Sequence, residues 1–132
     1  MKKHLLVAAL LVAPACFKPR DSKLDEIPKL ASLAEVMQAN ETIAGPQWKM
    51  IGDESYEADD WTKASDASAR LVALSERAKE FSRGEAFDKY RANWESHAKA
   101  LGAAAEKKDA AAASKALEDL KATCKACHAE TR

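Results

Sequence analysis

The spacing of apolar residues predicts a wholly helical chain after residue 28. No stretch shows the alternation of apolar and polar positions that a half-buried strand requires. Apolar residues instead recur every three or four positions, which is the period of an amphipathic helix. Glycines, which would interrupt helices, number only 4. Four segments show the helical period, so the pattern predicts an all-α fold.

The first two helical segments are expected to lie between Pro28 and about Ser82. Pro28 suits the first turn of a helix, and Gly45-Pro46 interrupts the segment, after which residues 47–51 add a further turn. The apolar stripe of this first helix holds Leu30, Leu33, Met37, Asn40, Glu41 and Ala44. The second helix is expected to start at Asp59 or Asp60, one of which serves as its N-cap.

The last two helical segments are expected on either side of Asp109. The third helix follows Gly84, and the fourth opens at Asp109, which is a good N-cap. The apolar stripe of the third holds Phe87, Tyr90, Trp94, Ala98, Leu101 and Ala105. That of the fourth holds Ala113, Leu117, Leu120, Cys124 and Cys127. Short connections make neighbouring helices antiparallel, so the prediction is an up-down-up-down four-helix bundle.

The first fifteen residues have the pattern of a secretory signal peptide. Lys2 and Lys3 precede the apolar run 5–12, which is too short to span a bilayer as a helix. Ala13-Pro14-Ala15 then gives the small-x-small pattern of a cleavage site. We therefore divide the chain into a signal peptide (1–15), a tether (16–28) and a helical domain (29–132), and expect export.

Cys16 is the first residue after the expected cleavage site, which resembles a bacterial lipoprotein signal. In that interpretation Cys16 is acylated, and more than one acyl chain anchors a protein stably in a membrane. Phe17 in the next position, by resemblance to other lipoproteins, favours the outer membrane. The alternative is ordinary cleavage, which leaves Cys16 as a free thiol at the terminus.

The charge of the chain is balanced. Lys and Arg number 21, as do Asp and Glu, so the formal net charge is zero. Loss of Lys2 and Lys3 with the signal peptide leaves the mature chain slightly acidic. No charge excess points to nucleic acid as a partner.

The sequence CKACHAETR contains the strongest chemical signal in the chain. Cys124, Cys127 and His128 have the spacing C-x-x-C-H, which is that of covalent attachment of c-type haem. The two thiols reach the two vinyl groups of the porphyrin, and His128 binds the iron as its proximal ligand. A thioredoxin-like redox motif would need a βαβ context, and a zinc site would need a second Cys/His pair.

The late position of C-x-x-C-H in a helical chain resembles the class II c-type cytochromes, the cytochrome c′ family. The resemblance covers residues 29–132 and rests on C-K-A-C-H, on Arg132 four positions after the histidine, and on Trp94 in the third helix. It implies a four-helix bundle with one covalently attached haem c. It also implies redox proteins as partners and a homodimer formed through the first two helices.

The resemblance also suggests Met37 as the second, distal ligand of the iron. Low-spin members of the family carry M-x-x-N on the first helix, and this chain has Met37-Gln38-Ala39-Asn40. A methionine on an apolar stripe is otherwise a core residue. Met50 and His97 are the rival candidates. Met50 lies beyond Gly45-Pro46, and His97 reads as a surface or hydrogen-bonded histidine.

One departure from the family concerns the haem propionates. Relatives carry an arginine four residues before the distal position, where this chain has Leu33 followed by Ala34. Lys29 or a residue of another helix is expected to take its place. The function expected is that of a periplasmic electron carrier, not an enzyme. The alternative is a high-spin cytochrome c′ that binds NO or CO at an open iron site.

Overall fold

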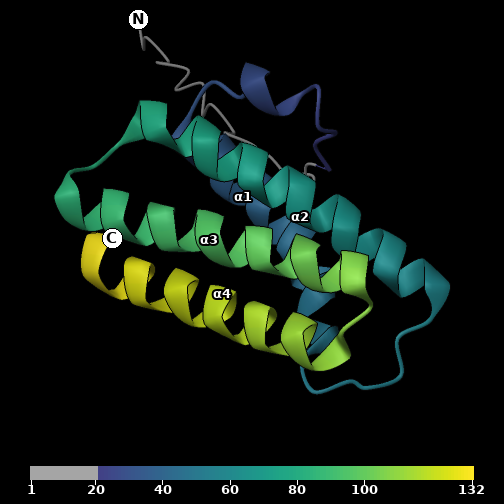
Figure 1. Cartoon of the computed structure of the whole chain (residues 1–132). Helices are drawn as coiled ribbons and strands as arrows, with labels where there is room; N and C mark the ends of the chain where they lie inside the picture. The colour runs from purple at the N-terminus through teal and green to yellow at the C-terminus, as the bar shows by residue number, and fades with distance from the viewer. Residues whose placement is uncertain (1–20) are drawn as a thin grey trace, which may run out of the picture.

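The computed structural model describes residues 21–132 and shows an all-α bundle of four helices (Figure 1). The helices are α1 (Leu33–Ala44), α2 (Ala58–Ala78), α3 (Glu85–Lys107) and α4 (Ala110–Thr131). Three short 3-10 segments accompany them, namely η1 (Ile27–Lys29), η2 (Gly45–Met50) and η3 (Lys79–Phe81). No strand occurs in the described residues. The predicted fold class is confirmed.

The connection between α3 and α4 consists of two residues. Lys108 ends α3 in the left-handed conformation, with φ 54°. Asp109 then caps α4, because its carboxylate accepts a hydrogen bond of 2.9 Å from the backbone N–H of Ala112. The predicted N-cap is confirmed, and α3 and α4 run antiparallel side by side (Figure 1).

The first two helices begin at other residues than predicted. Pro28 lies in η1, and α1 begins only at Leu33, after Ser32, whose hydroxyl accepts from the backbone N–H of Glu35. The N-cap of α2 is Glu57, with Asp60 at its N3 position. The Asp60 side chain accepts from the Glu57 backbone N–H, so the acidic residue expected to be the cap instead completes a capping box.

The segment before α1 packs against α2, so the folded part starts earlier than residue 29. Ile27 and Leu30 are buried in the core. The guanidinium of Arg77 donates two hydrogen bonds to the Leu30 carbonyl, of 2.9 Å from Nε and 2.6 Å from Nη2. Arg70 pairs with Asp21 at 2.8 Å. Ile27, which we expected in the tether (16–28), is thus part of the packed core.

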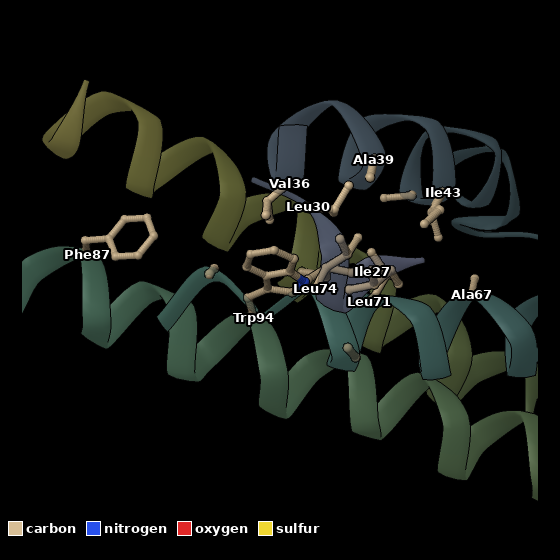
Figure 2. Close-up of a cluster of buried hydrophobic side chains, with 14 residues drawn as sticks. Ile27, Leu30, Val36, Ala39, Ile43, Ala67, Leu71, Leu74, Phe87 and Trp94 are labelled. Atoms are coloured by element: carbon tan, nitrogen blue, oxygen red, sulfur yellow. The ribbon is translucent and has the colours of Figure 1, made fainter. Parts of the chain in front are cut away.

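The core consists of two clusters, of which the larger, the cavity-end cluster, joins α1, α2 and α3 (Figure 2). Its labelled members are Ile27, Leu30, Val36, Ala39, Ile43, Ala67, Leu71, Leu74, Phe87 and Trp94. The face of α1 that is buried here carries Val36, Ala39 and Ile43. In the predicted stripe of the first helix, Leu30 and Ala44 are buried, Leu33, Met37 and Asn40 are half-buried, and Glu41 is exposed.

The second cluster, the far-end cluster, joins α2, α3 and α4 at the other end of the bundle. Its members are Ala64, Leu101, Ala104, Ala105, Ala113, Ala116 and Leu117. These small side chains let the helices approach closely. At Gly102 of α3, a Cβ atom would lie 2.5 Å from Oγ of Ser68 on α2. That hydroxyl donates a hydrogen bond of 2.7 Å to the Ala98 carbonyl, which fixes it between the two helices.

Candidate haem site

A cavity lies between α1, α3 and α4 at the end of the bundle that holds the last turn of α4. This main lobe is partly open to solvent, and its lining is mainly apolar. It is lined by Met37, Asn40, Phe87, Tyr90, Arg91, Trp94, Thr123, Cys124, Cys127 and His128. An adjoining outer lobe shares Met37, Phe87, Cys127 and His128 with it. The four residues predicted to hold haem therefore line one continuous space.

The two cysteines lie on the face of α4 that borders the main lobe. Residues three apart share a helix face, and Cys124 and Cys127 are both free thiols and half-buried. Burial, followed by the nearby charge of Cys127, raises the pKa of Cys124 to about 11. Cys124 is consequently a neutral thiol at neutral pH. Thr131, one turn further on, donates to the Cys127 carbonyl at 2.8 Å and closes the last turn.

His128 lies at the mouth of the cavity, on the turn that carries the cysteines. Its side chain lines both lobes although the residue is exposed as a whole. Partial burial, and then the positive charge of Arg132, lower the pKa of His128 below its usual value. The imidazole is therefore neutral at neutral pH, with a nitrogen lone pair free to bind iron.

Met37 supplies the third sulfur atom of the cavity lining within residues 21–132. It lies on α1 and lines both lobes. The rival candidates lie elsewhere. Met50 packs against the far-end cluster. His97 lies near Asp119, whose pKa is lowered first by Lys115 and to a lesser degree by the charge of His97.

Three buried polar atoms of the main lobe have no hydrogen-bond partner within the described residues. They are Oδ1 of Asn40, Nε of Arg91 and Nε1 of Trp94. A buried polar atom without a partner costs roughly 1–3 kcal/mol, and three around one apolar space indicate that a further group belongs there. Two thiols for covalent attachment and a neutral imidazole for the iron are the groups that a c-type haem requires. The site therefore fits this cofactor.

Two side-chain pairs hold the cavity wall. The Tyr90 hydroxyl of α3 donates to Oε2 of Glu130 at 2.6 Å, which ties α3 to the turn that carries His128. Arg91 is held by Glu95 at 3.0 Å, and the Arg91 side chain is only 12% exposed. Sequence reasoning did not identify Arg91. Its position, four residues after Phe87, is the signal that could have found it, because it falls on the same helix face.

The outer lobe is where relatives are expected to bind the propionates. It is lined by Leu33, Ala34, Met37, Arg83, Phe87, Cys127, His128, Thr131 and Arg132. Leu33 and Ala34 do line it, as the register suggested, but they carry no charge. The expected substitute Lys29 is not among the lining residues. The basic residues that do line the outer lobe are Arg83, which precedes α3, and Arg132.

A comparison with known protein families supports a haem-binding cytochrome. The family model described as Cytochrome C' matches residues 75–132 and supports the class II cytochrome c′ family. Proteins of this family bind an iron-containing c-type haem covalently and are generally periplasmic. The cofactor is therefore haem c, as the sequence predicts.

The match covers the end of α2 and all of α3 and α4, and thus both cysteines and His128. It does not extend to α1, so it does not reach Met37. Searches of curated proteins and of solved structures give no match. Cys16 and residues 1–15, the expected signal peptide, lie outside the described residues. Within residues 21–132, no helix is long and apolar enough to cross a membrane.

Proposed function

We propose that the protein carries single electrons through one haem c. The cofactor is attached at Cys124 and Cys127, with His128 as the proximal ligand of the iron and Met37 as the distal one. The observation that supports this most is the position of Met37. It lies on α1 and lines the same cavity as the three residues of α4, so α1 and α4 each contribute a potential iron ligand to one space.

The residues of the site have different roles in the proposed electron transfer. When bound, the haem supplies the iron that accepts and releases the electron, and Met/His ligation raises its potential relative to ligation by two imidazoles. Phe87 and Trp94 exclude water from the ring, because both are buried. The thiols and the imidazole are all assigned to holding the cofactor, so we propose a carrier and not an enzyme.

The visible spectrum of Met37→Ala beside the wild type tests the distal ligand. We expect wild-type protein to be low-spin, with the weak long-wavelength band of ferric Met–iron ligation. Met37→Ala should lose that band, become high-spin and bind CO. Met50→Ala is the matched control, because it removes the same side chain outside the cavity, and it should leave the spectrum unchanged.

The alternative function has a clear signature in the same experiment. A high-spin wild-type spectrum that shifts readily with CO would show an open iron site. Met37 would then be a wall residue, and NO or CO binding would replace electron transfer as the proposed function. A colourless product from a host that exports protein and attaches haem would contradict haem attachment itself.

We further propose that the protein is exported and anchored at Cys16 by lipid, on the periplasmic side of the outer membrane. The signal-like residues 1–15 and the position of Cys16 support this. Mass spectrometry of the mature N-terminus should show acyl chains, and Cys16→Ser should release the protein into the soluble fraction. An unmodified mature Cys16 would indicate ordinary cleavage.

The proposed partners are redox proteins of the cell envelope and a second copy of this chain, and not nucleic acid. The balanced charge supports no particular redox partner. A homodimer through α1 and α2 is implied by the resemblance to the family. Sedimentation of the haem-bearing protein over a range of concentrations tests it, and a constant monomer mass would exclude a stable dimer.

A further inference from the structure

We infer that Arg83 binds a propionate of the haem, in place of the first-helix arginine that relatives carry. This inference rests on the proposed attachment of haem at Cys124 and Cys127. It concerns the outer lobe of the cavity, which continues from the main lobe through the shared residues Met37 and His128.

Two basic residues line the outer lobe. They are Arg83 and Arg132, and the other titratable side chains there are Cys127 and His128. The α1 and α3 residues that line it are uncharged, and no Asp or Glu lines it. Such a surface favours an anionic oxygen ligand, because each positive charge nearby stabilises the ionised form.

The two arginines of the outer lobe differ from the other arginines of the described chain in having no partner. Arg70, Arg77 and Arg91 each form an ion pair with a carboxylate. Within residues 21–132, neither Arg83 nor Arg132 forms an ion pair or a hydrogen bond through its side chain. Their donors are therefore available to a carboxylate that the chain itself does not supply.

The backbone around Arg83 is fixed by its neighbours. Gly84 has φ 105°, a conformation that favours glycine, and its N–H donates to the hydroxyl of Ser82 at 3.2 Å. Gly84 is also the N-cap of α3, and its carbonyl accepts from the Asp88 N–H. Arg83 thus stands at a defined place, one turn before Phe87, which lines both lobes.

Arginine is well suited to this role. Its planar guanidinium can bind both oxygens of a carboxylate at once, which a lysine cannot do. Relatives are expected to supply this group from the first helix, where Leu33 and Ala34 stand in this chain. Both residues line the same lobe as Arg83. In this chain the positive charge therefore comes from Arg83, just before α3, and not from α1.

The test follows the midpoint potential of the haem-bearing protein as a function of pH. A neighbouring guanidinium keeps a carboxylate ionised to lower pH. Arg83→Gln should therefore move the inflection that reports propionate ionisation upward, by about one pH unit for such an exposed pair. Arg83→Lys keeps the charge but not the bidentate geometry, so it should shift the inflection in the same direction by a smaller amount. Lys107→Gln, which removes a charge at the opposite end of α3, should not change it.

A second arm distinguishes a propionate from a free anion with the same chemistry. The wild type and Arg83→Gln are compared in phosphate and in chloride at equal ionic strength. A propionate gives the same Arg83→Gln shift in both salts. A wild-type curve that moves with phosphate, while that of Arg83→Gln does not, would assign Arg83 to a solution anion and overturn the inference.

Two further results would count against Arg83. An inflection that is unchanged in Arg83→Gln overturns the inference, as does a shift seen in Arg132→Gln alone. Both are measured on protein that carries haem, so they are separate from failure of the proposed function, in which the wild type itself lacks the cofactor. Circular dichroism should show wild-type helicity in Arg83→Gln, because this side chain makes no bond within the described residues.

Discussion

The cavity end and the far end of the bundle are packed on different principles. At the cavity end, the aromatic side chains of Phe87 and Trp94 surround an open space, and three polar atoms there lack partners. At the far end, alanines bring α3 and α4 together. A polar group there is paired: the Ser114 hydroxyl of α4 accepts a hydrogen bond of 2.8 Å from the Gly52 N–H.

This difference shows how a short bundle combines a cofactor site with a stable fold. Small side chains give close helix contacts and leave no room for a ligand, whereas large ones placed around a gap form a wall but not a filled core. The far end can then stabilise the helices whether or not the other end is filled. Four changes test this division, beginning with the largest expected effect.

The double variant Cys124→Ser with Cys127→Ser should lose all covalently bound haem, because no thiol remains on α4 to form a thioether bond. Intact-protein mass spectrometry after expression in a haem-competent host measures the loss. Ala126→Ser is the matched control: it lies on the same turn, is exposed and does not line the cavity. A double variant that still carries the covalent cofactor would contradict the assigned attachment site.

Leu117→Ala should lower the free energy of unfolding by about 2–5 kcal/mol, because it removes a fully buried side chain from the far-end cluster. Denaturant unfolding of the haem-bearing protein measures this. The visible spectrum should stay as in the wild type, because Leu117 does not line the cavity. Leu24→Ala, which truncates a side chain that is 51% exposed, should cost little. A changed spectrum in Leu117→Ala would show that the two ends are not independent.

Gly102→Ala should destabilise the bundle by a net amount of about 1 kcal/mol. The added Cβ would displace the hydroxyl of Ser68 from its hydrogen bond, and overpacking costs roughly 1–3 kcal/mol, offset by about 1 kcal/mol of helix propensity. In a Ser68→Ala background the same change should cost less. Denaturant unfolding measures both costs. Equal costs in the two backgrounds would mean that the added Cβ does not clash with the Ser68 hydroxyl.

Glu95→Gln should change the free energy of unfolding least of the four, and only at a pH where the Glu95 carboxylate is ionised. Hydrogen bonds from Lys99 and then Arg91 lower the pKa of Glu95 from 4.5 to about 2 in the folded protein. The ionised carboxylate therefore stabilises the fold above pH 4.5, and this contribution is lost as the pH falls toward 2. We expect less than about 1 kcal/mol, because the pairing with Lys99 is exposed.

Unfolding of the wild type and of Glu95→Gln at neutral pH and near pH 2 measures this contribution. The two proteins should differ at neutral pH and converge in acid. Glu118→Gln, which changes an exposed carboxylate on α4, serves as the control. A difference between the wild type and Glu95→Gln that persists near pH 2 would show that the effect does not come from ionisation.

The helices and the chemistry of the site could be predicted from local signals. The period of apolar residues identified all four helices, and the N-cap Asp109 is a short-range pattern that the structure keeps. The spacing of Cys124, Cys127 and His128 defined the candidate site because those residues must share one helix face. Met37 was placed by register with a family, and the structure brings it to the same cavity.

Features that depend on packing between distant residues could not be predicted. Pro28 satisfied the rules for a helix start, but Ile27 and Leu30 are drawn onto α2, and the helix begins only at Leu33. The sequence indicates only that Arg83 lies in a loop, whereas in the structure it lines the outer lobe together with Leu33 and Ala34 of α1. Its role depends on which charges it meets and which it does not, and only the assembled bundle determines that.

The two-residue connection between α3 and α4 has a consequence for the order of assembly. Closing so short a loop costs little chain entropy, and helical hairpins are held by local contacts, which form fastest. This hairpin carries both cysteines, His128 and the aromatic wall of the cavity. This hairpin can therefore form first, and the packing of α1 would bring Met37 to the cavity wall afterwards.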